Sequence, residues 1–222
     1  MKISNDTLEI LKKFAEINQS IVIQPGNKIK TINSLKNILA HADVKEDFPM
    51  EVAIYDLTEF IGLLTSLEEP ELSFKDKYLT VGSGKRKVKY YYADSDYVVK
   101  PEKEIDMPEC EINFQLTEDI FNNLLKIANT LQLHDISLKG CTKSNKIYLC
   151  ANNQKNDTSA DYSEEVGEGV KEKFNIFFKR ENLKLLPGDY DVSISSKGVS
   201  HFKSASKNLE YWIALEPNSQ YS

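Results

Sequence analysis

The side chains that could perform acid, base or metal chemistry are few and widely separated in this chain. The three histidines, His41, His134 and His201, each stand far from a cysteine and from any carboxylate at a metal-ligand spacing. The sequence contains no His-Glu-x-x-His pattern and no nucleophile elbow. Carboxylates are plentiful, yet no spacing singles out a pair for general acid and base work. We therefore expect no catalytic centre, no metal and no cofactor, and a protein that is not an enzyme.

A glycine-rich stretch at 82–87, GSGKRK, shares some features with a phosphate-binding loop. It lacks the four-residue gap between the glycines and the Ser or Thr after the Lys that a P-loop requires. We interpret the stretch as a hairpin turn with a basic exit. The three cysteines, Cys110, Cys141 and Cys150, are odd in number and lack the C-x2-C spacing of a zinc or redox site, so we expect reduced thiols.

The charge of the chain restricts how it could bind a polyanion. The formal net charge is −6, and both halves are mildly acidic. Nonspecific binding of nucleic acid depends on many phosphate contacts from Lys and Arg, so any such contact must be confined to one face. Six basic residues on the solvent sides of helical segments are candidates for that face: Lys12, Lys13, Lys126, Lys179, Arg180 and Lys184. Glu9, Glu16 and Glu59 share these faces, which leaves an ordinary solvated surface as the alternative.

Four segments have the apolar period of amphipathic helices. They are residues 5–18, 56–69, 116–132 and a short basic helix within 173–195. Asn5 or Asp6 can cap the first helix, and Thr117 is the cap signal of the third. Leu183 and Leu186 form the apolar side of the fourth.

Most of the remaining chain alternates in polarity or is rich in β-branched and aromatic residues. The stretch 152–170 is an exception, because its turn and charge composition is typical of a long solvated loop between strands. The sequence therefore predicts an α+β chain that is mainly β.

The two halves of the chain show weak internal repetition. A shift of 113 positions matches Lys13 with Lys126 and aligns the helical segments around them. The polar stretch 100–109 reads as a linker between the halves. We expect two similar domains, 1–105 and 106–222, each with two helices packed on curved antiparallel sheets.

No segment predicts a membrane span or a secretion signal. The apolar runs are shorter than the roughly 18 residues that a spanning helix needs. The first ten residues, MKISNDTLEI, contain one Lys and no continuous apolar block, unlike a signal peptide. We expect a protein that is not secreted and stays in a cytosol.

Several segments, taken in order, carry a resemblance to a known family. They are LEILKKFAEIN at 8–18, EVAIYDLTEFIGLL at 51–64, VVKP at 98–101, LLKIANTLQ at 124–132, FNIFF and LPGDY within 174–190, and the ending YWIALEPNSQYS. With these segments the chain resembles the sliding clamps, or DNA polymerase processivity factors, of T-even-type bacteriophages, almost from end to end. Glu181 and the tyrosines at 90–92 depart from the pattern that the family would require.

The resemblance implies a fold and a function. Clamp domains place sheets outside and helices around a central hole, and six domains close a ring, so a two-domain chain implies a homotrimer. Such a ring encircles duplex DNA without regard to sequence and tethers the replicative polymerase. The resemblance further implies loading by an ATP-dependent clamp loader, a platform for other phage proteins including those of late transcription, and the cytoplasm of the infected host. The six basic residues would then face the DNA.

Partner binding is also implied by the resemblance. Clamps bind short apolar tails of polymerase and loader between the domain linker and the last strand. In this chain those places are occupied by Ile105, Met107, Pro108, Trp212 and Ala214. The alternative is that Trp212 simply packs in the core of the second domain.

Two other classes of protein remain as alternatives at the level of sequence. A noncatalytic phage structural or assembly protein would also be β-rich, acidic and free of cofactors. A carbohydrate-active β-protein would use a pair of carboxylates. Duplicated helices with basic residues on matching faces favour the clamp over both.

Overall fold

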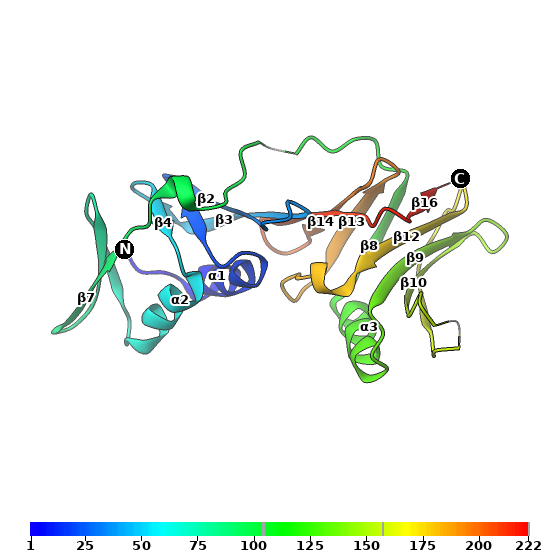
Figure 1. Cartoon of the computed structure of the whole chain (residues 1–222), viewed down its shortest axis with the longest axis horizontal. Helices are drawn as coiled ribbons and strands as arrows, with labels where there is room; N and C mark the ends of the chain where they lie inside the picture. Colours follow the sequence, from blue (N-terminus) through cyan, green and yellow to red (C-terminus); the bar gives the residue numbers. More distant parts are fainter. Residues whose placement is uncertain (104, 157, 222) are drawn as a thin grey trace. The chain divides into compact units, whose positions relative to one another are not determined.

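The computed structural model describes residues 1–103, 105–156 and 158–221, and no cis peptide bond occurs among them. The chain divides into two compact units, Met1–Glu104 and Ile105–Ser222, which we call unit 1 and unit 2. Each is mainly β with antiparallel sheets, so the predicted α+β class is confirmed (Figure 1).

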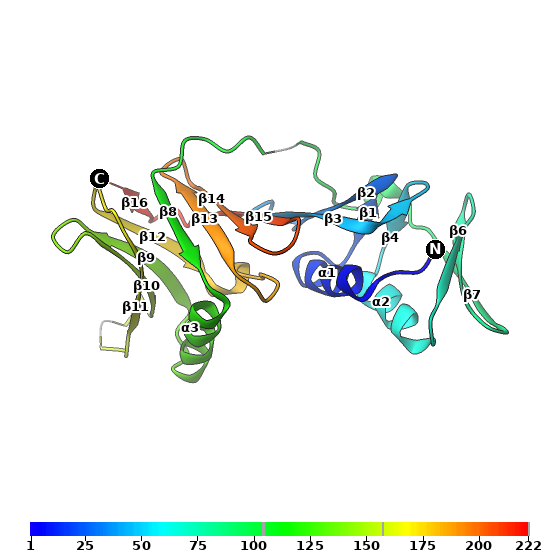
Figure 2. The same ribbon diagram turned by 180° about the vertical axis from the view of Figure 1, so that it is seen from behind.

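Unit 1 contains two α-helices and seven strands among its described residues. Its elements are α1 (Asn5–Ile17), β1 (Ile21–Ile23), β2 (Gly26–Ile32), β3 (Ile38–Phe48), β4 (Val52–Ile54), α2 (Leu57–Ser66), β5 (Glu71–Phe74), β6 (Tyr78–Ser83), β7 (Arg86–Tyr91) and the 3-10 turn η1 (Ser95–Tyr97). Strands β2 and β3 form one antiparallel pair, β1 and β4 another, and β5, β6 and β7 a meander. Helices α1 and α2 pack together on the same side of β2 and β3 (Figures 1 and 2).

The start of helix α1 is fixed by hydrogen bonds to a carboxylate that is distant in the sequence. Its cap is Ser4, which accepts a hydrogen bond from the Thr7 amide, and not Asn5 or Asp6 as we predicted. The buried Glu46 on β3 accepts bonds from the Ser4 amide and the Thr7 hydroxyl, both at 2.5 Å. These two bonds fix the start of the helix to the sheet, which places the cap one or two residues earlier than local signals suggest.

Unit 2 contains one α-helix and nine strands among its described residues. Its elements are β8 (Ile112–Leu116), α3 (Glu118–Thr130), β9 (Asp135–Cys141), β10 (Lys146–Asn152), β11 (Tyr162–Glu168), β12 (Phe174–Lys179), the 3-10 turn η2 (Arg180–Asn182), β13 (Tyr190–Ser195), β14 (Val199–Ser204), β15 (Leu209–Ala214) and β16 (Gln220–Tyr221). One sheet has the order β11-β10-β9-β12-β16, and the strands β15-β14-β13-β8 follow one another in a second. Helix α3 begins at the predicted cap, since the Thr117 hydroxyl accepts from the Ile120 amide.

The core of unit 2 lies between α3 and the inner faces of these strands. Its lining includes Phe121 and Leu124 of α3, Leu138 of β9, Phe178 of β12 and Phe202 of β14. Phe178 and Phe202 meet edge to face with ring centroids 6.2 Å apart. Apolar side chains from both sheets and the helix therefore share one core.

The predicted fourth helix is wrong. Only the 3-10 turn η2 forms, and the chain after it is irregular. Leu183, Leu185 and Leu186 are all buried, so burial extends beyond the apolar side of Leu183 and Leu186 that we predicted. The Tyr190 hydroxyl donates to the Leu186 carbonyl at 2.6 Å, and the Leu186 amide donates to the Tyr211 hydroxyl at 3.1 Å. Tertiary bonds thus replace helical ones, and unit 2 lacks the second α-helix that we expected.

The predicted loop at 152–170 is also wrong in part, because it contains strand β11. The strand pairs with β10 through a register shift at Ile147 and Tyr148. Since β11 lies at the edge of its sheet, it needs a ladder on one side only and tolerates many charged residues. The charged residues of β11 therefore led us to predict a loop where the chain forms an edge strand.

Candidate nucleic-acid interface and partner sites

The basic residues of α1 differ in how they are neutralised. Ile10, Leu11 and Phe14 are buried, and this apolar face turns Lys12 outward, where it is exposed. The Lys13 ammonium lies 2.9 Å from a Glu16 carboxylate oxygen, and its side chain is only 20% exposed. Lys12 is therefore the stronger candidate for a phosphate contact on this helix.

Helix α3 presents a polar face with a single cation. Phe121, Leu124 and Ala128 are buried, which leaves Lys126 exposed among three exposed amides, Asn122, Asn123 and Asn129. Amide and ammonium groups can donate hydrogen bonds to phosphate oxygens without reading bases. This face has the chemistry of a weak, exchangeable phosphate contact.

The three basic residues near η2 stand in different environments. Lys179 is exposed at the end of β12, with its ammonium 3.7 Å from a Glu216 carboxylate oxygen. The Arg180 amide donates to the His134 carbonyl at 3.3 Å, which places η2 beside the loop after α3. Arg180 and Lys184 are both half-buried, although we predicted them on the exposed face of a helix. Their role as DNA contacts stays a prediction.

The residues assigned to a partner pocket are placed on a strand and on the linker. Trp212 lies on β15, opposite His201 of β14, and it is buried with 7% exposure. The two rings stack with centroids 4.9 Å apart, and His201 Nε2 lies 2.7 Å from a Glu210 carboxylate oxygen. Ala214 ends the same strand and is half-buried.

The linker side of this predicted pocket is less regular. Ile105 is exposed at 39%, whereas Met107 and Pro108 are half-buried. An apolar side chain exposed on a linker is available for contact with a partner. The assignment of the pocket nonetheless stays a prediction.

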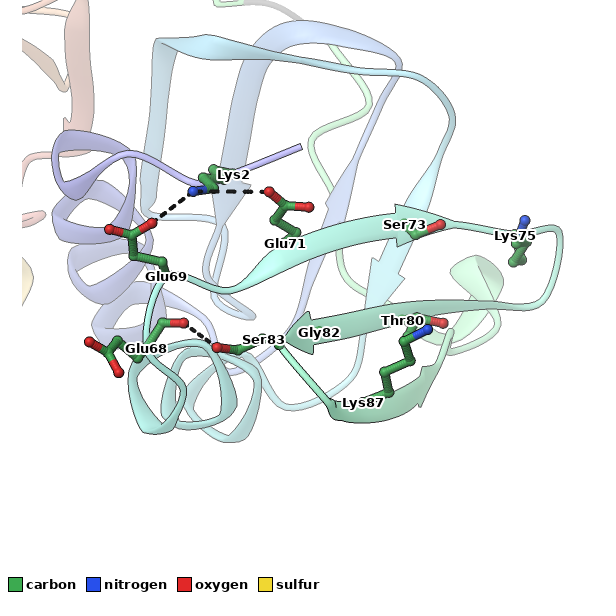
Figure 3. A pocket seen from close by; sticks show the side chains of 11 residues that line it. Lys2, Glu68, Glu69, Glu71, Ser73, Lys75, Thr80, Gly82, Ser83 and Lys87 are labelled. Carbon is green, nitrogen blue, oxygen red and sulfur yellow. Dashed lines mark hydrogen bonds and ion pairs between the residues drawn. The ribbon is translucent and has the colours of Figure 1, made fainter.

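A polar trough that the sequence analysis did not anticipate lies over the β5–β6–β7 meander of unit 1 (Figure 3). The hairpin interpretation of GSGKRK is confirmed, because Ser83 pairs with Arg86 across a turn in which Gly84 has φ 58°. The signal that could have revealed the trough is the excess of basic residues in this segment. Between 71 and 92 the chain carries six basic and two acidic residues, although the whole is acidic.

Other chemistry is sparse in the part of the chain that the structure describes. No group of three or more His, Cys, Asp and Glu residues there could hold a metal ion. No described helix is long and apolar enough to cross a membrane. Cys110, Cys141 and Cys150 are free thiols.

Solved structures with the same architecture define the class of fold. The chain superimposes on Proliferating Cellular Nuclear Antigen from Entamoeba histolytica with a TM-score of 0.68 and 16% identity, covering 94% of each chain. It also matches PCNA from A. fulgidus, solved with the C-terminal region of FEN-1 bound, with a TM-score of 0.70 and 13% identity over 96% of each chain. At such low identity these likenesses establish the DNA-clamp fold alone.

Sequence comparisons identify the family within that class. Residues 4–100 match the model of DNA polymerase processivity factors, and residues 113–217 match that of the C-terminal part of the gp45 sliding clamp. The chain is 36% identical to the sliding clamp of Vibrio phage KVP40 over 97% of this chain and 99% of that one. It is 29% identical to the sliding clamp of Enterobacteria phage T4 over 100% and 99%. The chain belongs to the sliding-clamp family, and the resemblance to clamps of T-even-type phages is confirmed.

Proposed function

We propose that this protein encircles duplex DNA as a homotrimeric ring and tethers the replicative DNA polymerase, without catalysis of its own. The observation that carries the proposal is the end-to-end match to phage sliding clamps, with the processivity-factor model covering most of unit 1. Tethering turns each polymerase dissociation into an intramolecular rebinding at high effective concentration. Processivity therefore needs no active site on the clamp.

Head-to-tail contact between copies is supported by the strand order of the two units, which leaves free edges in both. Among the described strands, β7 ends the meander of unit 1 and β11 ends the larger sheet of unit 2. Each free edge presents unpaired backbone groups that another chain can pair with. Pairing β7 of one copy with β11 of the next is a head-to-tail contact, which closes when each step rotates by a third of a turn.

Duplex DNA would be held by topology more than by affinity. An acidic chain repels DNA from most of its surface, and a few cations such as Lys12 and Lys126 on helix faces offer phosphate contacts. Contacts to phosphates carry no base information, so they can be exchanged as the ring moves. This arrangement permits sliding.

The partners that we propose are the C-terminal peptide of the polymerase and an ATP-dependent clamp loader, with proteins of late transcription as further users of the same ring. The pocket formed by the linker and β15 would take their apolar tails, with Trp212 and Met107 as the large and the adaptable surface. The site of action would be the cytoplasm of the infected host.

Mass measurement in solution tests the ring. A trimer of about 76 kDa, three times the chain mass of 25.3 kDa, should exchange with monomer on dilution. A strict monomer at high micromolar concentration would contradict the proposal.

Loading on circular primed DNA tests the function. Replacement of Lys12, Lys126, Arg180 and Lys184 by Ala should leave the trimer intact and shorten its retention on the circle. Processive synthesis by the cognate polymerase should fall with it. If the fourfold variant supports synthesis as well as the wild type, these residues are not the DNA contacts.

A further inference from the structure

The outer face of the β5–β6–β7 meander is an exposed sheet face with an unusual set of side chains. Leu72, Leu79 and Val81 are buried on the inner face, so their neighbours along each strand point outward. The register sets Glu71, Gly82 and Lys87 in one row of the outer face, and Ser73, Thr80 and Lys89 in the next.

A trough of about 810 Å³ crosses this face (Figure 3). Its floor carries small side chains, and a Cβ added at Gly82 would find no heavy atom closer than 3.7 Å. Lys2 stands at one side, 2.9 Å from a Glu69 oxygen and 4.0 Å from a Glu71 oxygen. A floor without bulky groups permits close approach by the backbone of a bound chain.

Positive charge gathers at the other side of the trough. Lys75 and Lys87 line it and form no ion pair with a described residue. Next to them Lys89 lies over the Tyr78 ring at 5.0 Å, and Tyr78 contacts Tyr91 with centroids 5.6 Å apart. Because these ammonium groups have no carboxylate partner in the part of the chain that the structure describes, they are available to an acidic ligand.

We propose that this trough is a docking site for an extended, acidic polypeptide segment of another protein. Its acidic side chains would meet Lys75 and Lys87, and its backbone would lie over Thr80 and Gly82. Charge complementarity at the Lys75 and Lys87 side supports this occupant, because residues 71–92 carry six basic and two acidic side chains on a chain whose net charge is −6.

The lining favours a polypeptide over a nucleic acid strand. Glu68, Glu69 and Glu71 border the trough beside Lys2. A nucleic acid presents a negative charge at every phosphate and would place some of them against these carboxylates, whereas a polypeptide can place a neutral or basic residue there. The site shares no residue with the predicted pocket at Trp212 and goes beyond the proposed tethering function.

Peptide binding to the purified full-length protein tests the proposal. The probe is a fluorescein-labelled peptide of five Asp-Ser repeats, followed by fluorescence anisotropy at low salt. Comparison probes are a peptide of five Lys-Ser repeats and an oligothymidine of ten nucleotides. We expect the acidic peptide to bind with a Kd of roughly 10–100 µM and the other two to bind at least about tenfold more weakly.

Two variants and a matched control locate the binding. The double variant Lys75→Glu with Lys87→Glu should weaken binding of the acidic peptide at least about tenfold. Gly82→Val should do the same by filling the floor while keeping every charge. Lys143→Glu with Lys155→Glu makes the same change in net charge on unit 2, where both residues are exposed, and should change the Kd less than about twofold.

Three results would overturn the proposal. The first is an equal loss of affinity for the acidic peptide in the charge variant and in its control. The second is an acidic peptide that does not bind at 1 mM. The third is oligothymidine that binds more tightly than the peptide and whose binding is abolished by the same variants. Because Lys87 lies on β7, which we propose at the ring interface, the mass of each variant in solution is measured as well, so that loss of the ring and loss of the peptide site are distinguished. The clamp function would stand in each of the three cases.

Discussion

Both units have a long helix followed by four strands, a second, shorter helical segment and at least three more strands, but the two units differ at that second segment. In unit 1, Asp56 caps α2 by accepting from the Glu59 amide at 2.9 Å, and Leu57, Phe60 and Leu64 are buried at helical spacing. In unit 2, the corresponding stretch forms a three-residue turn, and the leucines that follow are held by hydroxyls of tyrosines from the sheet. A similar order of elements therefore does not require the same local structure, because tertiary bonds can replace a helical turn.

The largest effect is expected at the tyrosine that replaces helical bonds in unit 2. Tyr190 is 2% exposed and packs against Phe202 and Tyr211. Tyr190→Ala should destabilise the protein by about 3–5 kcal/mol in urea unfolding, since it leaves a cavity and frees the Leu186 carbonyl. Tyr190→Phe removes only the hydroxyl and should cost about 1–2 kcal/mol. Equal costs for the two variants would show that the hydrogen bond, and not packing, dominates.

A second comparison concerns one glycine in each unit. A Cβ at Gly140 of β9 would overlap the Phe174 ring, which stacks on Tyr221, whereas a Cβ at Gly82 of β6 would meet its neighbours at ordinary contact distances of 3.7 Å or more. Gly140→Ala should therefore cost about 1–3 kcal/mol through overpacking. Gly82→Ala should be neutral or stabilise by up to about 1 kcal/mol. Thermal unfolding of the two single variants measures the difference, and a neutral Gly140→Ala would mean that Phe174 can move aside.

These contrasts also show what the sequence could and could not predict. The three α-helices follow from unbroken apolar periods with capping residues, and Thr117 and Asp56 act through neighbours only three residues away. The cap at Ser4 could not be predicted from local signals, because Glu46 reaches it across 42 positions. A two-leucine period likewise predicted a helix after β12, since the bonds from Tyr190 and Tyr211 are invisible in the sequence.

The candidate sites divide in the same way. The pairing of Lys13 with Glu16 is a neighbour contact on one helix and was readable from their spacing. The contact of Lys179 with Glu216 joins distant segments, so it could not be predicted from their spacing. The trough combines Lys2 with residues of three strands, so its geometry appears only after the chain has folded.

A smaller effect is expected at the helix that only unit 1 possesses. Asp56→Ala removes the cap of α2 and also the acceptor of a bond from the Gln19 side chain at 3.0 Å. Asp56→Ala should lower the free energy of unfolding by about 1 kcal/mol. Asp56→Ser keeps a capping oxygen and should recover most of it. Urea unfolding of both variants measures this, and a full-sized loss in Asp56→Ser would assign the effect to Gln19 instead of the cap.

The smallest expected effect is a difference between the two units in how their stability depends on pH. Among the described residues, Glu46 of unit 1 is the only buried acidic side chain, and unit 2 has none. Burial raises the pKa of Glu46, but the hydrogen bonds from Thr7 and Ser4 outweigh it and leave the pKa below its usual value. A carboxyl with a lowered folded pKa stabilises the protein above its unfolded pKa, near 4.3, and the stabilisation is lost as the pH falls through the folded value.

Acid should therefore loosen the start of α1 before it affects α3. Hydrogen exchange of the two helices between about pH 6 and pH 3, corrected for intrinsic rates, measures this difference. The Glu46→Gln variant should abolish the extra acid sensitivity of α1, because an amide does not titrate in this range. A modest change is expected, since burial and hydrogen bonding act on this carboxyl in opposite directions. Equal acid sensitivity of α1 in the variant and the wild type would show that Glu46 does not control the start of the helix.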